Sequence, residues 1–231
     1  IYGQLGGLDN IYLDDFNENQ GYQIIGANPN DRIGTFIGGL KDIDNNGYPE
    51  FIIGAPYIGK AYVILGQEII NNNLDLNNLT SSQGFTITGS ELNYQSGMSS
   101  VWIGDINNDG KADYAIGLPN SNIVYVLYGQ DPGSNTDINL DGLTLNQGFK
   151  ILGEGSFGRS FSHAGDVNGD GIDDLIIGAA YAYSNRGASY VIYGKSGNLG
   201  NIDINNLTLE QGFIVIGGEN NFVSGYSVSG N

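Results

Sequence analysis

The sequence predicts an all-β protein built from repeated units, and three observations support this prediction. Aromatic strand formers are frequent, with 15 Tyr and 9 Phe in 231 residues, while helical periodicity is weak along the whole chain. Glycine is abundant and proline scarce, with 38 Gly against 5 Pro, which suits short strands joined by flexible turns. The third observation is an internal repeat whose parts keep a nearly constant spacing.

The repeat is marked by a segment that has glycine at both ends and apolar residues between them. Its copies begin 63, 64 and 64 residues apart, at Gly21, Gly84, Gly148 and Gly212, and end at Gly26, Gly89, Gly153 and Gly217. Nearly the same spacing separates three acidic loops, which start at Asp42, Asp105 and Asp166. Because independent anchors share one period, the chain is a repeat array.

Each repeat is expected to hold four short strands. In the second repeat, the first strand lies at 97–104, the second at 114–117 and the third at 123–129, while the fourth is the segment 84–89 and its equivalents. The long connection 130–147 contains apolar residues and is expected to pack locally. About 60 residues in four strands match one blade of a β-propeller, whereas the WD40 and kelch repeats are shorter.

The repeat anchors predict where the blades lie. Residues 1–33 are expected to end a preceding blade, 34–89, 97–153 and 158–217 to form three blades, and 218–231 to start a further blade, all within one propeller domain. Seven blades of this size would need roughly 440 residues. We therefore expect about three and a half blades, as a piece of a longer protein or a half-ring that pairs with more blades.

The charge and the absence of cysteine exclude several classes of function. Asp and Glu number 25 against 8 Lys and Arg, which gives a formal net charge of −17. Without a basic patch, nucleic-acid binding is excluded. The absence of Cys excludes disulfides and thiolate metal sites. No apolar run approaches the roughly 18 residues of a membrane span, so none is expected in this segment.

The three acidic loops carry oxygen-bearing side chains at positions 1, 3, 5 and 9 and glycine at position 6. Calcium takes six to eight oxygen ligands, and the glycine permits a sharp turn that brings these oxygens together. We therefore expect about three calcium ions, one in each loop. The predicted ligands are Asp42, Asp44, Asn46, the carbonyl of Tyr48 and Glu50 in the first loop, Asp105, Asn107, Asp109, the carbonyl of Lys111 and Asp113 in the second, and Asp166, Asn168, Asp170, the carbonyl of Ile172 and Asp174 in the third.

Other interpretations of these loops fit less well. An EF-hand needs Glu at position 12, where this chain has Ile53, Ile116 and Ile177. Magnesium demands a stricter octahedron and retains water. An Asx-rich turn without metal explains one such loop but not three, because carboxylates about 5 Å apart repel by roughly 3 kcal/mol per pair at an effective dielectric near 20. The first loop departs most from the pattern, since Asn46 replaces an acid and Glu50 is longer than Asp.

Two further motifs occur in phase with the loops, Phe157-Gly158 in the third repeat and Gly54-Ala55-Pro56 in the first. With them, the sequence resembles the FG-GAP repeat of integrin alpha-chain propellers and of microbial surface proteins, over essentially the whole chain. Other repeats depart mildly from the motif, with Ile33-Gly34 for Phe-Gly and Gly117-Leu118-Pro119 for Gly-Ala-Pro. The resemblance implies a seven-bladed propeller with calcium in the loop between the first and second strands of a blade.

The resemblance also implies that a ligand meets the face opposite the calcium loops. The candidate residues there are Tyr57, Tyr94, Tyr181, Tyr183 and Arg186. The alternative is that they are ordinary solvated loop residues. Two glycosylation sequons, Asn78-Leu79-Thr80 and Asn206-Leu207-Thr208, occupy equivalent positions.

These observations favour a secreted calcium-binding module that recognises a protein or glycan in adhesion at a cell surface or matrix, because extracellular calcium fills loops of modest affinity. One alternative is a non-catalytic accessory propeller of a secreted enzyme such as a phospholipase, since FG-GAP repeats also occur beside such domains. Another is an architectural part of a large surface protein. Catalysis by this chain is not expected, because its one histidine, His163, lies in a packing or channel-lining position.

Overall fold

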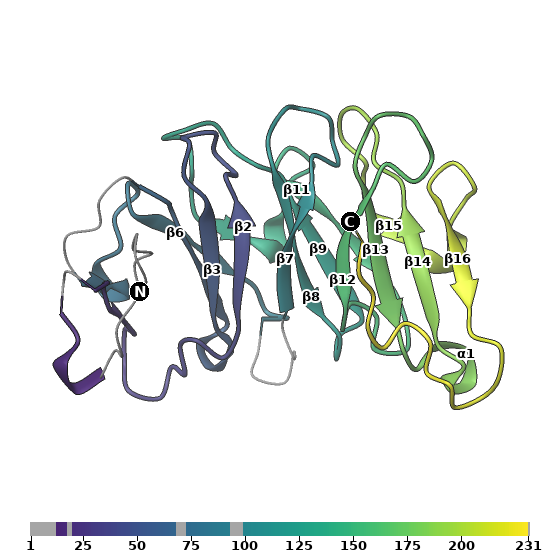
Figure 1. Cartoon of the computed structure of the whole chain (residues 1–231), viewed down its shortest axis with the longest axis horizontal. Coiled ribbons are helices and arrows are strands. Elements are labelled where there is room, and N and C mark those ends of the chain that lie inside the picture. Colours follow the sequence, from purple (N-terminus) through teal and green to yellow (C-terminus); the bar gives the residue numbers. More distant parts are fainter. Residues whose placement is uncertain (1–12, 18–19, 68–72, 93–98, 231) are drawn as a thin grey trace, which may run out of the picture.

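A computed structural model shows the chain as a row of twisted antiparallel sheets that follow one another in sequence order (Figure 1). The structure describes residues 13–17, 20–67, 73–92 and 99–230. Within them, helical structure is confined to short 3-10 turns and the four-residue turn α1 (Ala182–Asn185), in which Tyr183 and Ser184 have left-handed backbone conformations. The prediction of an all-β protein built from propeller blades is therefore confirmed.

Each blade is an antiparallel meander of four strands in which sequence neighbours pair. The first blade consists of β2 (Ile37–Lys41), β3 (Glu50–Ala55), β4 (Lys60–Ile64) and β6 (Gly84–Thr88). The second consists of β7 (Ser99–Gly104), β8 (Asp113–Leu118), β9 (Ile123–Leu127) and β11 (Gly148–Leu152). The third consists of β12 (Phe161–Gly165), β13 (Asp174–Ala179), β14 (Ala188–Ile192) and β16 (Gly212–Ile216). The first strands of successive blades contact each other, β2 with β7 and β7 with β12.

A short strand from each following blade extends these sheets. The strand β5 (Leu74–Asp75) pairs in parallel with β1 (Ile24–Ile25), β10 (Ile138–Asn139) with β6, and β15 (Ile202–Asp203) with β11. Each of these short strands leads into a 3-10 turn: η3 (Leu76–Asn78), η4 (Leu140–Gly142) and η5 (Ile204–Asn206). Two further 3-10 turns are η1 (Leu13–Asp15) and η2 (Pro56–Ile58).

The sequence suggested that the connection 130–147 packs locally, and Ile138 and Leu140 do lie in one cluster with Tyr125 of their own blade. The structure adds that β10 crosses to pair with the preceding blade. An Asx side chain before each short strand fixes this crossing. The N–H of Thr86 in β6 donates to Asp137 Oδ1 at 2.7 Å, and the N–H of Lys150 in β11 donates to Asn201 Oδ1 at 3.0 Å. The same kind of bond joins Gln23 and Asn73 at 3.0 Å.

The hydrophobic core lies between neighbouring blades, and β8 shows how the sequence produces it. All six residues of β8 are buried, and successive side chains of a strand point to opposite faces. Tyr114 and Ile116 belong to the cluster shared with the first blade, whereas Ala115 belongs to the cluster shared with the third. A strand buried on both faces is apolar at nearly every position.

Neighbouring blades approach each other closely at Gly117, which stands where the first repeat has the glycine of Gly-Ala-Pro. A Cβ atom at Gly117 would collide with the carbonyl oxygen of Gly158 in the next blade. Substitution Gly117→Ala should therefore lower the free energy of unfolding by about 1–3 kcal/mol, as overpacking does. Urea denaturation of the two proteins measures this change.

The control for this prediction is Gly142→Ala, because a Cβ atom at Gly142 meets nothing within 4 Å. Its effect on stability should be much smaller. Equal effects of the two substitutions would show that the close approach at Gly117 does not limit the packing of the blades.

Candidate metal centre

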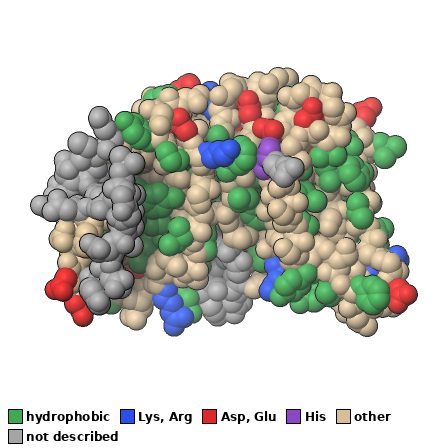
Figure 2. Space-filling view, viewed as in Figure 1, with side chains coloured by type: hydrophobic (Ala, Val, Ile, Leu, Met, Phe, Trp, Pro, Cys, Tyr) green, Lys and Arg blue, Asp and Glu red, His purple; other side chains and the backbone are tan. Residues whose placement is uncertain are grey.

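The three acidic loops lie at one end of the blades, each between the first and second strands. They span 42–50 after β2, 105–113 after β7 and 166–174 after β12. Figure 2 shows several Asp and Glu side chains along the upper edge of the molecule in this view, the end that carries these loops. We call them loop 1, loop 2 and loop 3.

The carboxylate at position 1 organises each loop by accepting two backbone hydrogen bonds. In loop 1, Asp42 accepts from the N–H of Asn46 at 3.0 Å and from the N–H of Gly47 at 2.9 Å. The same two bonds are repeated by Asp105 with Asp109 and Gly110, and by Asp166 with Asp170 and Gly171. These bonds turn the backbone back toward the start of the loop.

Left-handed backbone conformations at positions 4 and 6 make this tight turn possible. At position 6, Gly47, Gly110 and Gly171 have φ values of 94°, 85° and 88°, where a side chain would be strained. At position 4, Asn45, Asn108 and Gly169 have φ values of 56°, 56° and 80°. Asn and Gly are the residues that tolerate this conformation. The requirement at position 4 was missed in the sequence, where only the glycine at position 6 stood out.

The side-chain oxygens at positions 3 and 5 also accept backbone hydrogen bonds from within the loop. In loop 1, the N–H of Asn46 donates to Asp44 Oδ1 at 3.2 Å, and the N–H of Tyr48 donates to Asn46 Oδ1 at 2.8 Å. Loops 2 and 3 repeat both bonds at their own positions 3 and 5. Each side-chain oxygen that accepts one N–H keeps a further acceptor site for a cation.

The carboxylate at position 9 is buried and joins two segments of backbone. Glu50 accepts from the N–H of Ile43 at 2.6 Å and from the N–H of Gly66, just past β4, at 3.1 Å. The equivalent bonds join Asp113 to Ile106 and Gly129, and Asp174 to Val167 and Gly194. The sequence suggested only that position 9 closes the cage. The structure adds that this carboxylate clamps the loop to the end of the third strand.

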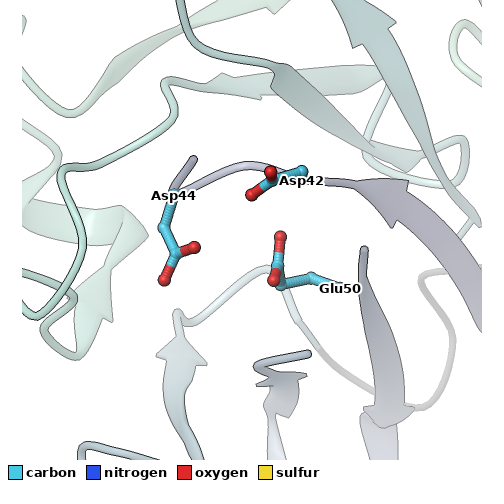
Figure 3. Close-up of side chains that lie close together, drawn as sticks. All are labelled: Asp42, Asp44 and Glu50. Carbon is cyan, nitrogen blue, oxygen red and sulfur yellow. The ribbon is translucent and has the colours of Figure 1, made fainter. Parts of the chain in front are cut away.

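Loop 1 gathers three carboxylates in a small volume. Oxygen atoms of Asp42, Asp44 and Glu50 all lie within 4.8 Å of one another, and Figure 3 shows the three groups around a shared space. Asp44 and Glu50 are only 2% exposed. In loops 2 and 3, position 3 is instead an Asn whose Nδ2 donates to the carboxylate at position 5, at 3.1 Å for Asn107 and 2.9 Å for Asn168.

Burial makes the ionised form of these carboxylates costly. It raises the pKa of Glu50 to about 7, although the N–H groups of Ile43 and Gly66 oppose the shift. Burial likewise raises the pKa of Asp113 to about 8, and it raises the pKa values of Asp44 and Asp174. A cation beside these groups would favour their ionised form. The donor set, which consists of oxygens alone, fits a hard cation such as calcium.

The candidate ligand residues lie at the opposite strand ends, in the connections between the second and third strands. Tyr57, Tyr181 and Tyr183 are between 42% and 46% exposed. The guanidinium of Arg32 stacks over the ring of Tyr57 at 4.1 Å from its centroid. Arg186 is half-buried, and its Nε donates to the carbonyl of Gly217 at 2.8 Å, which gives it a structural role. Tyr94 lies outside the described residues.

The single histidine takes part in contacts between the second and third blades. His163 Nε2 lies 2.8 Å from Asp173 Oδ1, and the ring of His163 packs on Trp102 with centroids 4.5 Å apart. The other oxygen of Asp173 accepts from the N–H of Asp105 at 2.8 Å. The packing position expected for His163 is therefore what the structure shows, while the role of Asp173 was missed in the sequence.

Comparison with known proteins supports the resemblance drawn from the motifs. Residues 157–192 match the family model of the FG-GAP repeat, so the chain carries this repeat in its third blade. No helix in the described part of the chain combines the length and hydrophobicity needed to cross a bilayer.

Curated relatives are similar to this chain over most of its length. Phosphatidylinositol-glycan-specific phospholipase D of Mus musculus is 28% identical over 213 residues, which are 82% of this chain and 23% of that protein. Integrin alpha pat-2 of Caenorhabditis elegans is 28% identical over 174 residues, 67% of this chain and 13% of the integrin. Integrin alpha-4 of Xenopus laevis is 28% identical over 159 residues, 64% of this chain and 15% of the integrin. The chain spans less than a quarter of each relative.

The raised pKa values predict how stability depends on pH when a chelator removes divalent cations. The folded protein holds the protons of Glu50 and Asp113 more tightly than the unfolded chain does. The free energy of unfolding should therefore fall as pH rises from about 5 to about 8. Urea denaturation at a series of pH values measures this dependence.

Two substitutions assign the effect to the loops. Glu50→Gln should reduce the fall in stability below about pH 7, because it removes one of the titrating groups. Glu210→Gln is the control, because Glu210 is an exposed acid outside the three loops, and it should leave the fall in stability in place. A protein more stable at pH 8 than at pH 5 in chelator would contradict the assignment.

Proposed function

We propose that this chain is a calcium-binding module of an integrin-like extracellular propeller, which serves adhesion or the recognition of a protein or glycan ligand. The observation that carries the proposal is the common hydrogen-bond network of the three loops. In each, backbone N–H groups of the loop donate to side-chain oxygens at positions 1, 3 and 5, and a buried carboxylate stands at position 9. A turn that served only to connect two strands would not need this set of oxygens three times.

A divalent cation in each loop offsets the cost of the buried acids. The carboxylates of loop 1 lie close enough to repel one another, and burial leaves little water to screen them. Three calcium ions would change the formal charge of the chain from −17 to −11, because each ion adds two positive charges. The ions would reduce the repulsion between carboxylates most strongly in the loops, where the negative charges are concentrated.

An extracellular location follows from the affinity expected of such loops. Sites of modest affinity fill at the millimolar calcium found outside cells but remain empty in resting cytosol. The similarity to integrin alpha chains supports a role at the cell surface. Loops at the opposite strand ends, with exposed Tyr57, Tyr181 and Tyr183, offer the surface on which a ligand would bind.

A second candidate function is an accessory propeller of a phospholipase-type enzyme. The similarity to phosphatidylinositol-glycan-specific phospholipase D covers 82% of this chain, against 67% for integrin alpha pat-2. In this proposal also, the chain binds calcium and is a non-catalytic part of the enzyme. An architectural role in a large surface protein would instead give no binding to cells or glycans.

The proposal predicts about one calcium ion per loop. Titration calorimetry after treatment with chelator should show about three bound ions, and calcium should raise the melting temperature because it binds the folded chain. Asp105→Ala and Asp166→Ala should each abolish one site, since each removes the carboxylate that organises its loop.

Glu210→Ala is the matched control, because Glu210 is an exposed acid outside the three loops. It should retain all the calcium sites. Absence of both heat and a melting shift at millimolar calcium would remove the metal from the proposal, whatever the chain recognises.

Ligand binding is predicted to depend on calcium only indirectly, because the two sets of loops lie at opposite ends of the strands. Tyr181→Ala should weaken the binding of labelled protein to cultured animal cells or to a glycan array without changing the number of calcium ions. Tyr181 suits this test, since 46% of it is exposed and its loss should cost little stability.

Asn120→Ala supplies the comparison, because Asn120 is the exposed residue at the equivalent position of the second blade. If Tyr181→Ala binds normally while folded variants of the calcium loops lose the partner, the calcium end is the recognition face.

A further inference from the structure

One residue from the second blade reaches into loop 1 of the first blade. Asn135 lies on the connection between β9 and β10, and its Nδ2 donates to Asp44 Oδ2 at 3.1 Å. The two residues are 91 positions apart in the sequence. Both are nearly inaccessible to solvent, with 5% of Asn135 and 2% of Asp44 exposed. The bond therefore joins a candidate metal ligand to the neighbouring blade in a dry environment.

The amide of Asn135 also has an unused acceptor. Its Oδ1 is buried and has no hydrogen-bond partner. A buried carbonyl without a partner is costly, and such groups in native proteins call for an explanation, of which a bound ion or water is one. Since Oδ1 belongs to the same planar amide as the nitrogen that contacts Asp44, it lies within a few ångström of that carboxylate.

Comparison of loop 1 with loop 2 indicates why an amide stands at position 135. Asn135 precedes Ile138 of β10 by three residues, and Leu199 precedes Ile202 of β15 by three, so the two positions are equivalent. The connection that carries Leu199 runs past loop 2, where the N–H of Gly197 donates to the carbonyl of Asn107. Loop 2 has this neutral Asn107 at position 3, and its Nδ2 donates to Asp109 of the same loop. Loop 1 has a charged, buried Asp44 there, and the amide supplies the donor that its second oxygen needs.

We propose that Asn135 is a positioning residue of the loop 1 calcium site, supplied across the boundary between two blades. This role rests on the calcium binding proposed above. Asn135 holds the outer oxygen of Asp44, so that the inner oxygen, already bound to the N–H of Asn46, stays directed toward the shared space of the loop. Its free Oδ1 is an acceptor that the cation, or water bound to the cation, would satisfy. Loop 1 is thus complete only when the second blade is packed against the first.

The test is a calcium titration of isotope-labelled protein followed by NMR, with the position 6 glycines as reporters. The amide signals of Gly47, Gly110 and Gly171 report on loops 1, 2 and 3 separately, since each N–H donates to the position 1 carboxylate of its own loop. Asn135→Ala should weaken calcium binding at Gly47 about 10–100-fold, as loss of an outer partner of a metal ligand does. The titrations at Gly110 and Gly171 should be unchanged.

Two further variants separate this role from simple packing. Asn198→Ala is the control, because Asn198 lies on the equivalent connection of the third blade and its side chain donates to Asn146 instead of a loop carboxylate. It should leave all three titrations unchanged. In the background of Asp44→Asn, which gives loop 1 the neutral side chain of the other loops, Asn135→Ala should weaken binding at Gly47 much less.

Each result either supports or overturns the inference. A lower melting temperature of Asn135→Ala in chelator, with an unchanged titration at Gly47, would make Asn135 a packing residue only. Equal weakening at all three glycines would mean a global effect and would overturn the role in loop 1. If none of the glycines of the unsubstituted protein responds to calcium, the inference and the proposed function fail together, whereas a failure confined to Asn135→Ala leaves calcium binding intact.

Discussion

In each blade, a buried carboxylate at the ninth loop position holds two backbone segments together. The arrangement of the three acidic loops at the end of the blades depends on this clamp. Asp113, with no exposed surface, accepts one N–H from the second residue of its loop and another from Gly129, just beyond the third strand. The clamp sets the angle at which the loop leaves the sheet. Burial of this carboxylate disfavours its ionised form and raises the pKa of Asp113 to about 8. Because a nearby cation would favour the ionised form, the loop is a strong candidate for binding one.

The loops also connect the blades to one another. Asn45 of loop 1 donates to the carbonyl of Gly110 in loop 2 at 3.1 Å. The N–H of Lys195, in the third blade, donates to the carbonyl of Ile106 in loop 2 at 3.0 Å, and Asp173 accepts from the N–H of Asp105. Loops 1 and 2 are therefore each held partly by the blade that follows. A cation that orders one loop would stabilise the boundary between two blades as well as the turn itself.

The features that could be predicted from the sequence involve residues that lie close together in the chain or recur at a fixed spacing. The oxygens at positions 1, 3 and 5 and the glycine at position 6 follow from the spacing of a single loop, and the repeat itself follows from the 63-residue and 64-residue spacings. Asn135 could not be predicted, because its partner Asp44 is 91 residues away and only packing brings them together. The pairing of β10 with β6 was missed for a related reason, since a strand of two residues is too short to show alternation.

The end opposite the acidic loops is built differently, and the difference bears on the proposed recognition. In the turn between β13 and β14, Tyr183, Ser184 and Asn185 have φ values of 51°, 57° and 62°, a left-handed run that non-glycine residues adopt only under constraint. The carbonyl of Asn185 accepts from the N–H of Val223, and the N–H of Gly217 donates to the carbonyl of Gly187, so neighbouring backbone holds the turn in place. Strained conformations of this kind cluster at sites of function. A rigid turn that exposes a tyrosine also binds with little loss of conformational entropy, which makes this turn the best-prepared part of the candidate ligand face.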